Sequence, residues 1–349
     1  MAKTGDGSRR LLALLWLGIA AAMVLVPVWL GWTRWQAVLT GHPLVLVLAI
    51  ACGLCGFIAL AWAVATLVLG DRGDRDDAVR PRTERERIRR ADRRVALAVP
   101  AMLVCVLVVC ALAWSRPLPA DPTALAAMRS QNGVRVADRL TWYEMTPTAE
   151  DKAGDLIRPT TGFVFVPGAR VDPRAYARLL RPLAEAGYLV TVLKEPFGVA
   201  LADSRHAGRA MAVHPEIGQW VVGGHSLGGV AAASFADEQP QVNGAPVAGL
   251  VLYAAYPAGR LQRADLDVTS ISGDLDGLTT PEDVAEARDE LPPDTSYVVI
   301  PGAVHSFFGD YGVQDGDGTP TADRAAAQAQ IVEATQAVLA GVTPKPKKK

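Results

Sequence analysis

The stretch QWVVGGHSLGGV, residues 219–230, constrains the fold of this chain more than any other segment. Its apolar run, Trp220–Val222, predicts a β-strand, and the Val- and Ala-rich segment that begins at Val230 predicts a helix. Between them, the pattern Gly224-x-Ser226-x-Gly228 is typical of a sharp strand-to-helix turn that exposes a serine hydroxyl above a sheet, the nucleophile elbow. The sequence therefore predicts an α/β fold in which Ser226 is exposed at one edge of the sheet.

The glycines of this turn have a steric reason. A Cβ atom at Gly224 or Gly228 is expected to collide with the neighbouring strand and helix, whereas His225 occupies the variable position of the motif. The helix that follows directs its free N–H groups and the positive end of its dipole toward the place where an oxyanion forms. The turn thus predicts a site suited to attack on an acyl carbon.

Short apolar runs alternate with helical patterns from residue 139 onward, which predicts a mostly parallel sheet with helices on both faces. The expected strands are residues 139–145 (at an edge of the sheet), 162–166, 188–193, 220–222, 249–253, 268–272 and 296–300. The expected helices are residues 173–186, 202–212, 226–237, 281–291 and 321–339.

An elbow serine needs an acid and a histidine, which follow it in that order in this fold. The strand 268–272 leads into Gly-Asp-Leu-Asp-Gly, where Asp276 is the predicted acid and Asp274, placed for turn formation, is the alternative. His305 follows the strand 296–300, at the sheet edge where active residues collect. The remaining histidines fit this order poorly: His42, His206, His214 and, within the elbow itself, His225.

These residues predict acyl chemistry in which Ser226 is the nucleophile. His305 is expected to take the proton of Ser226 as the hydroxyl attacks, and Asp276 to hold the imidazole in the required tautomer. The oxyanion needs two main-chain N–H donors. We expect one from Leu227 and the other from the loop after strand 162–166, where Ala169 is favoured and Gly168 is the alternative.

The first part of the chain has a different character. Three uncharged, apolar runs, residues 11–32, 44–69 and 95–114, are each long enough to span a bilayer, and tryptophans stand near their ends. The loop 71–94 is dense in arginine, and the N-terminus is also basic. The positive-inside rule therefore predicts a multi-pass protein of the cell membrane whose N-terminus and arginine-rich loop are cytoplasmic, with everything after the third run on the outer face.

These patterns divide the chain into a membrane anchor (1–115), a linker (116–135), a domain with the predicted α/β fold (136–341) and a basic tail (342–349). The net charge of −1, and the acidic residues interleaved with the loop's arginines, argue against a nucleic-acid partner. All four cysteines lie in the apolar runs, so we expect neither disulfides nor a redox site. The Gly- and Asp-rich segment 309–319 lacks EF-hand spacing and predicts a surface turn instead of a calcium site.

Three further segments resemble a known family. FVPGARVDPRAYARLLRPLAEAGYLVTVLKEPFGVAL (165–201), SGDLDGLTTPEDV (272–284) and PGAVHSFFGDYGVQDGDG (301–318) are similar to the first strands and helix, the acid loop and the histidine loop of the bacterial alpha/beta hydrolase fold-5 family, which is related to the dienelactone hydrolases. The resemblance covers roughly residues 140–339. It implies an ester- or acyl-cleaving activity with no cofactor, and it places Ser226, Asp276 and His305 at the family's catalytic positions. Dienelactone hydrolases proper use a cysteine nucleophile, so dienelactone is not the expected substrate.

The predicted protein is a membrane-anchored, extracytoplasmic serine hydrolase that cleaves small-molecule or lipid-like carboxylic esters through an acyl-enzyme. The longest insertion between core strands is residues 195–219, so the chain leaves little room for a large cap, which predicts a shallow, open site. Two alternatives stay open. In the first, the protein is an acyltransferase, and the same serine passes the acyl group to an alcohol of the cell envelope. In the second, the hydrolase fold is catalytically silent and serves only as a binding domain.

Overall fold

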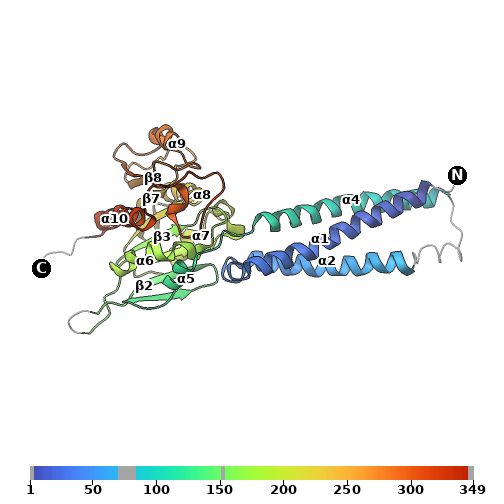
Figure 1. Cartoon of the computed structure of the whole chain (residues 1–349). Helices are drawn as coiled ribbons and strands as arrows, with labels where there is room; N and C mark the ends of the chain where they lie inside the picture. Colours follow the sequence, from blue (N-terminus) through green and yellow to red (C-terminus); the bar gives the residue numbers. More distant parts are fainter. Residues whose placement is uncertain (1–3, 70–83, 151–153, 345–349) are drawn as a thin grey trace. The chain divides into compact units, whose positions relative to one another are not determined.

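The computed structural model describes residues 4–69, 84–150 and 154–344. It divides into two compact units, one of residues 1–38 with 44–116 and the other of residues 39–43 with 117–349. Figure 1 shows the helices and strands of each unit.

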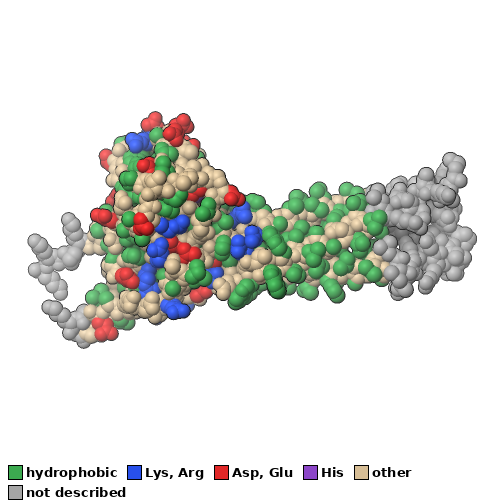
Figure 2. All heavy atoms as spheres, viewed as in Figure 1, with side chains coloured by type: hydrophobic (Ala, Val, Ile, Leu, Met, Phe, Trp, Pro, Cys, Tyr) green, Lys and Arg blue, Asp and Glu red, His purple; other side chains and the backbone are tan. Residues whose placement is uncertain are grey.

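The first unit consists of long helices: α1 (Thr4–Thr40), α2 (Pro43–Leu69) and α4 (Glu84–Trp114). Within the described residues, three stretches of these helices are long and apolar enough to cross a membrane: Leu12–Thr40, Pro43–Ala65 and Ala96–Trp114. Hydrophobic side chains cover their visible surface in Figure 2, and the four cysteines are free thiols. This surface suits a hydrocarbon environment, as the sequence predicts.

One boundary in this unit differs from the prediction. Helix α4 begins at Glu84, so the second half of the predicted loop 71–94 is helical and continuous with the third apolar run. Residues 70–83 of that loop and residues 345–349 of the predicted basic tail lie outside the described residues.

The second unit is built on one sheet. Its strands within the described residues are β1 (Val134–Asp138), β2 (Trp142–Pro147), β3 (Thr161–Val166), β4 (Leu189–Leu193), β5 (Gln219–His225), β6 (Gln241–Val242), β7 (Ala245–Tyr253), β8 (Asp267–Gly273) and β9 (Ser296–Ile300). They are ordered β1-β2-β4-β3-β5-β7-β8-β9, with β6 paired only to β7. β1 and β2 are antiparallel to their neighbours, and β4, β3, β5, β7, β8 and β9 run parallel.

Helices cover both faces of this sheet, as predicted for an α/β fold. They are α5 (Pro122–Ala127), α6 (Ala177–Glu185), α7 (His206–Ala212), α8 (Leu227–Glu238), α9 (Pro281–Glu286) and α10 (Arg324–Val342), with short 3₁₀ turns that include Pro173–Tyr176 and His305–Phe308. One core cluster joins α6 and α10 to the sheet, and a second joins α7 and α8 to its other face. Every residue of β3 is buried, because both of its faces are covered.

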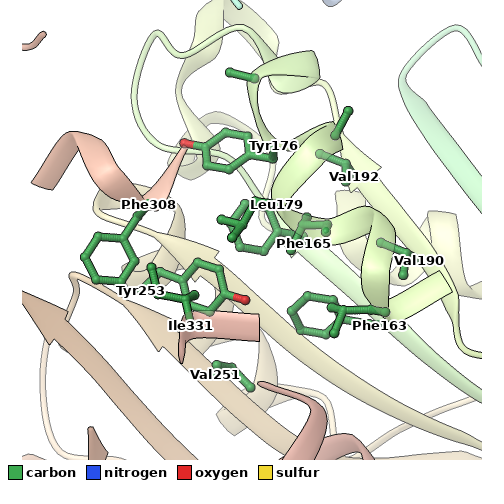
Figure 3. Close-up of a cluster of buried hydrophobic side chains, with 14 of the residues drawn as sticks. Phe163, Phe165, Tyr176, Leu179, Val190, Val192, Val251, Tyr253, Phe308 and Ile331 are labelled. Atoms are coloured by element: carbon green, nitrogen blue, oxygen red, sulfur yellow. The ribbon is translucent and has the colours of Figure 1, made fainter. Parts of the chain in front are cut away.

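Large aromatic side chains dominate the first of these core clusters. Phe163 and Phe165 of β3 and Tyr253 of β7 pack there against the side chains of α6 and α10, and Tyr176 and Phe308 complete the cluster (Figure 3). The rings of Phe165 and Tyr176 are centred 4.8 Å apart, and those of Phe165 and Tyr253 are 5.2 Å apart. Such contacts fix the ends of β3 and β7 relative to each other.

The N-terminal edge of the sheet corrects two predictions. Residues 139–145 do not form the edge strand: β2 begins at Trp142, and β1 lies outside it. The predicted linker 116–135 contains β1's first residues and helix α5, which Asp121 caps by accepting the N–H groups of Thr123 and Ala124 at 2.9 and 3.0 Å. Both elements are too short to show a clear hydrophobic period in the sequence.

Replacing Phe163 with alanine is expected to destabilise the second unit by about 3–5 kcal/mol, because the fully buried ring leaves a cavity that the sheet cannot close. Thermal unfolding of the full chain in detergent measures this. Val299→Ala is the matched control, since this strand side chain is 53% exposed and its loss should cost less than about 0.5 kcal/mol. Equal costs for the two variants would contradict the packing described here.

Candidate active site

Ser226 lies in the turn between β5 and α8 and has backbone angles of φ 53° and ψ −127°. This conformation is strained for a residue with a side chain. It is held by close packing: a Cβ atom on Gly224 would overlap the carbonyl oxygen of Gly228, and one on Gly228 would overlap the carbonyl oxygen of Val166. The elbow predicted from the sequence, including the steric role of both glycines, is thus present.

The loops that surround Ser226 all leave the carboxyl ends of parallel strands. They follow β3, β5, β8 and β9, which run in the same direction within the sheet. Parallel strands bring these loops to one edge, where ligands of open α/β sheets bind.

His305 and Asp276 form a buried pair at this edge. His305 Nδ1 lies 2.9 Å from Asp276 Oδ2 and 3.2 Å from Oδ1. His305 is 1% exposed and Asp276 is 3% exposed. The Asp276 carboxylate also accepts the main-chain N–H groups of Leu278 and Thr279, at 2.9 and 2.8 Å. These bonds satisfy the buried carboxylate and fix its orientation toward the imidazole.

Asp274, the alternative acid, has a different role. Its side chain is exposed, and its Oδ1 accepts the N–H of Gly302 at 2.6 Å. It therefore ties the loop after β8 to the turn after β9. The structure brings Asp276, and not Asp274, to the imidazole of His305.

Asp317 is a residue that the sequence reasoning missed. The segment 309–319 was expected to be a surface turn, yet the Asp317 carboxylate accepts the main-chain N–H groups of His305 at 3.0 Å and Ser306 at 2.8 Å. A longer contact of 3.4 Å joins it to the N–H of Gly277, beside Asp276. Asp317 thus holds the histidine loop against the acid loop. Only the excess of Asp and Gly in the segment hinted at a built loop.

The two expected oxyanion donors after β3 differ in the structure. The N–H of Gly168 donates to the hydroxyl of Tyr176 at 2.9 Å, so it is not available, which corrects the prediction for this residue. The N–H of Ala169 makes no hydrogen bond within the described residues. Leu227 is the first residue of α8, where an N–H has no partner inside the helix. In the part of the chain that the structure describes, the N–H groups of Ala169 and Leu227 are therefore both without a hydrogen-bond partner.

His225, the variable residue of the elbow, packs against His305. Their ring centroids lie 4.5 Å apart, and the His225 ring is fully buried. Burial, and in second place the charge of the nearby His305, lowers the pKa of His225 well below its ordinary value. His225 is therefore neutral at physiological pH.

Two other histidines belong to separate pairs. His206 Nδ1 lies 3.2 Å from Glu195, and His214 contacts Glu144 at 3.2 Å and Glu216 at 3.0 Å. Burial alone would lower the pKa of His214, but the hydrogen bonds to the two glutamates outweigh it and raise the pKa. Among the described residues, no group of three or more His, Cys, Asp or Glu side chains is arranged to hold a metal ion.

Comparison with protein families gives a match over most of this unit. Residues 162–330 match the Alpha/beta hydrolase family. The matched segment begins in β3 and ends within α10, so it includes Ser226, Asp276 and His305.

Comparison with solved structures gives distant likenesses. The chain is 14% identical to a thermostable esterase from Pseudomonas putida, with a TM-score of 0.46 over 64% of this chain and 88% of that one. It is 12% identical to esterase B from Lactobacillus rhamnosis, inhibited by a tributyrin phosphonate, with a TM-score of 0.44 over 63% and 90% of the two chains. An alpha-beta serine hydrolase homologue from Coxiella burnetii is 14% identical to this chain, with a TM-score of 0.40 over 62% of this chain and 99% of that one. The comparison with curated proteins gives no match.

The neutral His225 predicts a pH dependence of stability. Below pH ~6.5 the unfolded chain binds a proton at this imidazole that the folded chain does not, so the free energy of unfolding falls as the pH falls. Between pH 7.5 and 5.5 this costs about 1.4 kcal/mol, which His225→Asn should remove. Melting temperatures of the two proteins at both pH values measure the difference.

His214 provides a control of opposite sign. Because its pKa is raised in the folded state, it stabilises the fold below pH ~6.5 and loses this contribution as the pH rises through the folded pKa. His214→Asn should therefore steepen the loss of stability on acidification. If the free energy of unfolding depends on pH equally in wild type and in His225→Asn, then His225 takes up its proton in the folded protein and is not held neutral there.

Replacing Asp317 with alanine is expected to slow the reaction of Ser226 with a fluorophosphonate about 10- to 100-fold, since the histidine loop loses two charge-assisted hydrogen bonds of about 1.5–3 kcal/mol each, partly replaced by water. Asp315→Ala, in the same loop with an exposed side chain, should react at the wild-type rate. If both variants behave alike, Asp317 does not position His305.

Proposed function

Residues 162–330 match the alpha/beta hydrolase family, and on this premise we propose that the protein is a membrane-anchored serine hydrolase that cleaves carboxylic esters through an acyl-enzyme. The observation that carries the proposal is a strained elbow serine at the same sheet edge as a buried imidazole–carboxylate pair, with the ring of His225, the residue before Ser226, centred 4.5 Å from that of His305. A strained residue and a desolvated acid–base pair together are typical of a catalytic site.

The residues divide the reaction among them as follows. Ser226 Oγ attacks the acyl carbon while His305 takes its proton, and His305 then gives that proton to the leaving alcohol. Asp276 holds the Nδ1–H of His305 and stabilises the imidazolium. Water then attacks the acyl-enzyme with His305 again acting as base, which releases the acid and restores Ser226.

The oxyanion of each tetrahedral intermediate is bound by the N–H groups of Leu227 and Ala169. Both belong to elements that are fixed before substrate arrives, and the positive end of the α8 dipole adds to their effect. A donor of this kind is typically worth about 3 kcal/mol of transition-state stabilisation.

The apolar helices support the membrane part of the proposal. Three helices that can each cross a bilayer, with a basic N-terminus and an arginine-rich segment after the second, support a hydrolase domain outside the cytoplasm under the positive-inside rule. In that position the domain meets small-molecule or lipid-like esters of the cell envelope, which are the proposed substrates.

The test is fluorophosphonate labelling of the full chain in detergent, followed by turnover of short and medium nitrophenyl esters. Ser226→Ala should abolish labelling and lower kcat by about 10⁴-fold or more. Ser234→Ala is the control, because this serine lies on the same helix α8 and only bonds the carbonyl of Val230. No labelling of folded wild-type protein would refute the hydrolase and favour a binding domain.

Product analysis separates hydrolysis from acyl transfer. Incubation with an ester in water alone, and with glycerol or a sugar added, should give the free acid in both cases. A transfer product that dominates whenever the alcohol is present would identify an acyltransferase that uses the same serine.

A further inference from the structure

We propose that Tyr176 and His225 are positioning residues that hold the oxyanion loop, Pro167–Arg170, against the elbow, so that the N–H of Ala169 points at the reacting carbonyl. The proposal rests on the proposed hydrolase function. It concerns residues that take no proton from the substrate and act through the main chain of the loop.

The hydroxyl of Tyr176 joins the two parts of the site. It accepts the N–H of Gly168 at 2.9 Å and lies 2.8 Å from His225 Nδ1. Within the described residues, Nδ1 of His225 is the acceptor that the single hydroxyl proton of Tyr176 can reach, so we infer that the hydroxyl donates to Nδ1. His225 is therefore the tautomer protonated at Nε2, and one hydroxyl connects the loop after β3 to the last residue of β5.

The close packing around this hydroxyl leaves no space for a side chain at position 168. A Cβ atom on Gly168 would lie 2.8 Å from His225 Nδ1 and 3.1 Å from the Tyr176 oxygen. Tyr176 itself is fully buried, and its ring centroid lies 4.8 Å from that of Phe165 (Figure 3). The ring centroids of Tyr176 and His225 are 5.9 Å apart. The hydroxyl is thus held in place by its own ring as well as by its two partners.

The loop is fixed on both sides of Ala169. On one side, the N–H of Gly168 is bound to Tyr176. On the other, the N–H of Arg170, a residue with a φ of 62°, donates to the carbonyl of Gly198 at 2.8 Å. The N–H between them, that of Ala169, makes no hydrogen bond within the described residues. Because the N–H groups on both sides are bound, the loop is held in one conformation in which the N–H of Ala169 is preorganised to bind an oxyanion.

The neutral state of His225 is part of this arrangement. His305 becomes a cation during each half-reaction, and its ring centroid is 4.5 Å from that of His225. A second positive charge at that distance in a buried site would oppose proton transfer to His305. A tyrosine hydroxyl that donates to Nδ1 disfavours protonation there, in agreement with the lowered pKa of His225.

The consequence is a specific kinetic signature. Oxyanion donors act on charge that develops in the transition state, so a displaced loop should lower kcat and leave KM nearly unchanged. Tyr176→Phe keeps the ring and removes the hydroxyl. This variant should lower kcat and the rate of fluorophosphonate labelling about 10- to 100-fold. That loss is smaller than the one that follows removal of a whole oxyanion donor, which is typically about 10²- to 10³-fold in kcat.

Tyr253→Phe is the matched control for a lost buried hydroxyl. Tyr253 belongs to the same core cluster and is equally buried, but its hydroxyl bonds Thr335 Oγ1 at 2.6 Å, on α10. This variant should lose stability without a comparable loss of kcat. If the two variants lose kcat equally, the effect of Tyr176 is structural and the proposal is wrong.

Two substitutions of His225 give a rescue test. Asparagine retains an acceptor for the Tyr176 hydroxyl, whereas leucine removes it. His225→Leu should therefore match Tyr176→Phe, with KM within about 3-fold of wild type, and His225→Asn should retain most of kcat. The wild-type labelling reaction tests the hydrolase itself. If wild type labels and His225→Leu reacts equally fast, only the positioning role is refuted.

Discussion

The strained turn at Ser226 is the constraint on which the rest of the site depends. A serine with a φ of 53° persists only when its surroundings leave it no relaxed alternative. Here the surroundings are β5, in the interior of a parallel sheet, and α8, which approaches the strand so closely that Gly224 and Gly228 have no room for a side chain. The aromatic core beneath the sheet fixes the same strands, so the packing that stabilises the fold also holds the serine at the sheet edge.

Burial of charge is the second constraint at this edge. The carboxylate of Asp276 and the imidazole of His305 are both almost fully removed from water, which costs free energy unless their polar atoms are hydrogen-bonded within the protein. The main-chain donors of Leu278 and Thr279 offset that cost for the carboxylate, and Asp317 binds the main chain beneath His305. His225 is the complement of this arrangement: it is buried without a carboxylate partner and remains neutral, next to an imidazole that is proposed to become charged.

The two units of the chain obey different rules of solvation. In the helical unit, large apolar side chains such as Leu25 and Phe57 are more than half exposed, which is favourable only against hydrocarbon. In the hydrolase unit, apolar residues are collected into two cores and the charged side chains lie mainly outside. Figure 2 shows this contrast directly, and it agrees with the three helices that are long and apolar enough to cross a membrane.

The sequence by itself determined the features that local pattern encodes: the apolar runs of the helical unit, the alternation of strands and helices, and the strand–turn–helix around Ser226. Hydrophobic period and steric need act over a few residues, so one chain displays them without its fold. The sequence did not reveal β1 and α5, which are too short to show a hydrophobic period. Only the tertiary structure decided that Asp276 and not Asp274 faces His305, that Gly168 is already bonded, and that Asp317 and Tyr176 support the site. Each of these depends on which of two nearby groups points toward a partner from a distant loop, and that direction is set by packing between segments far apart in the chain.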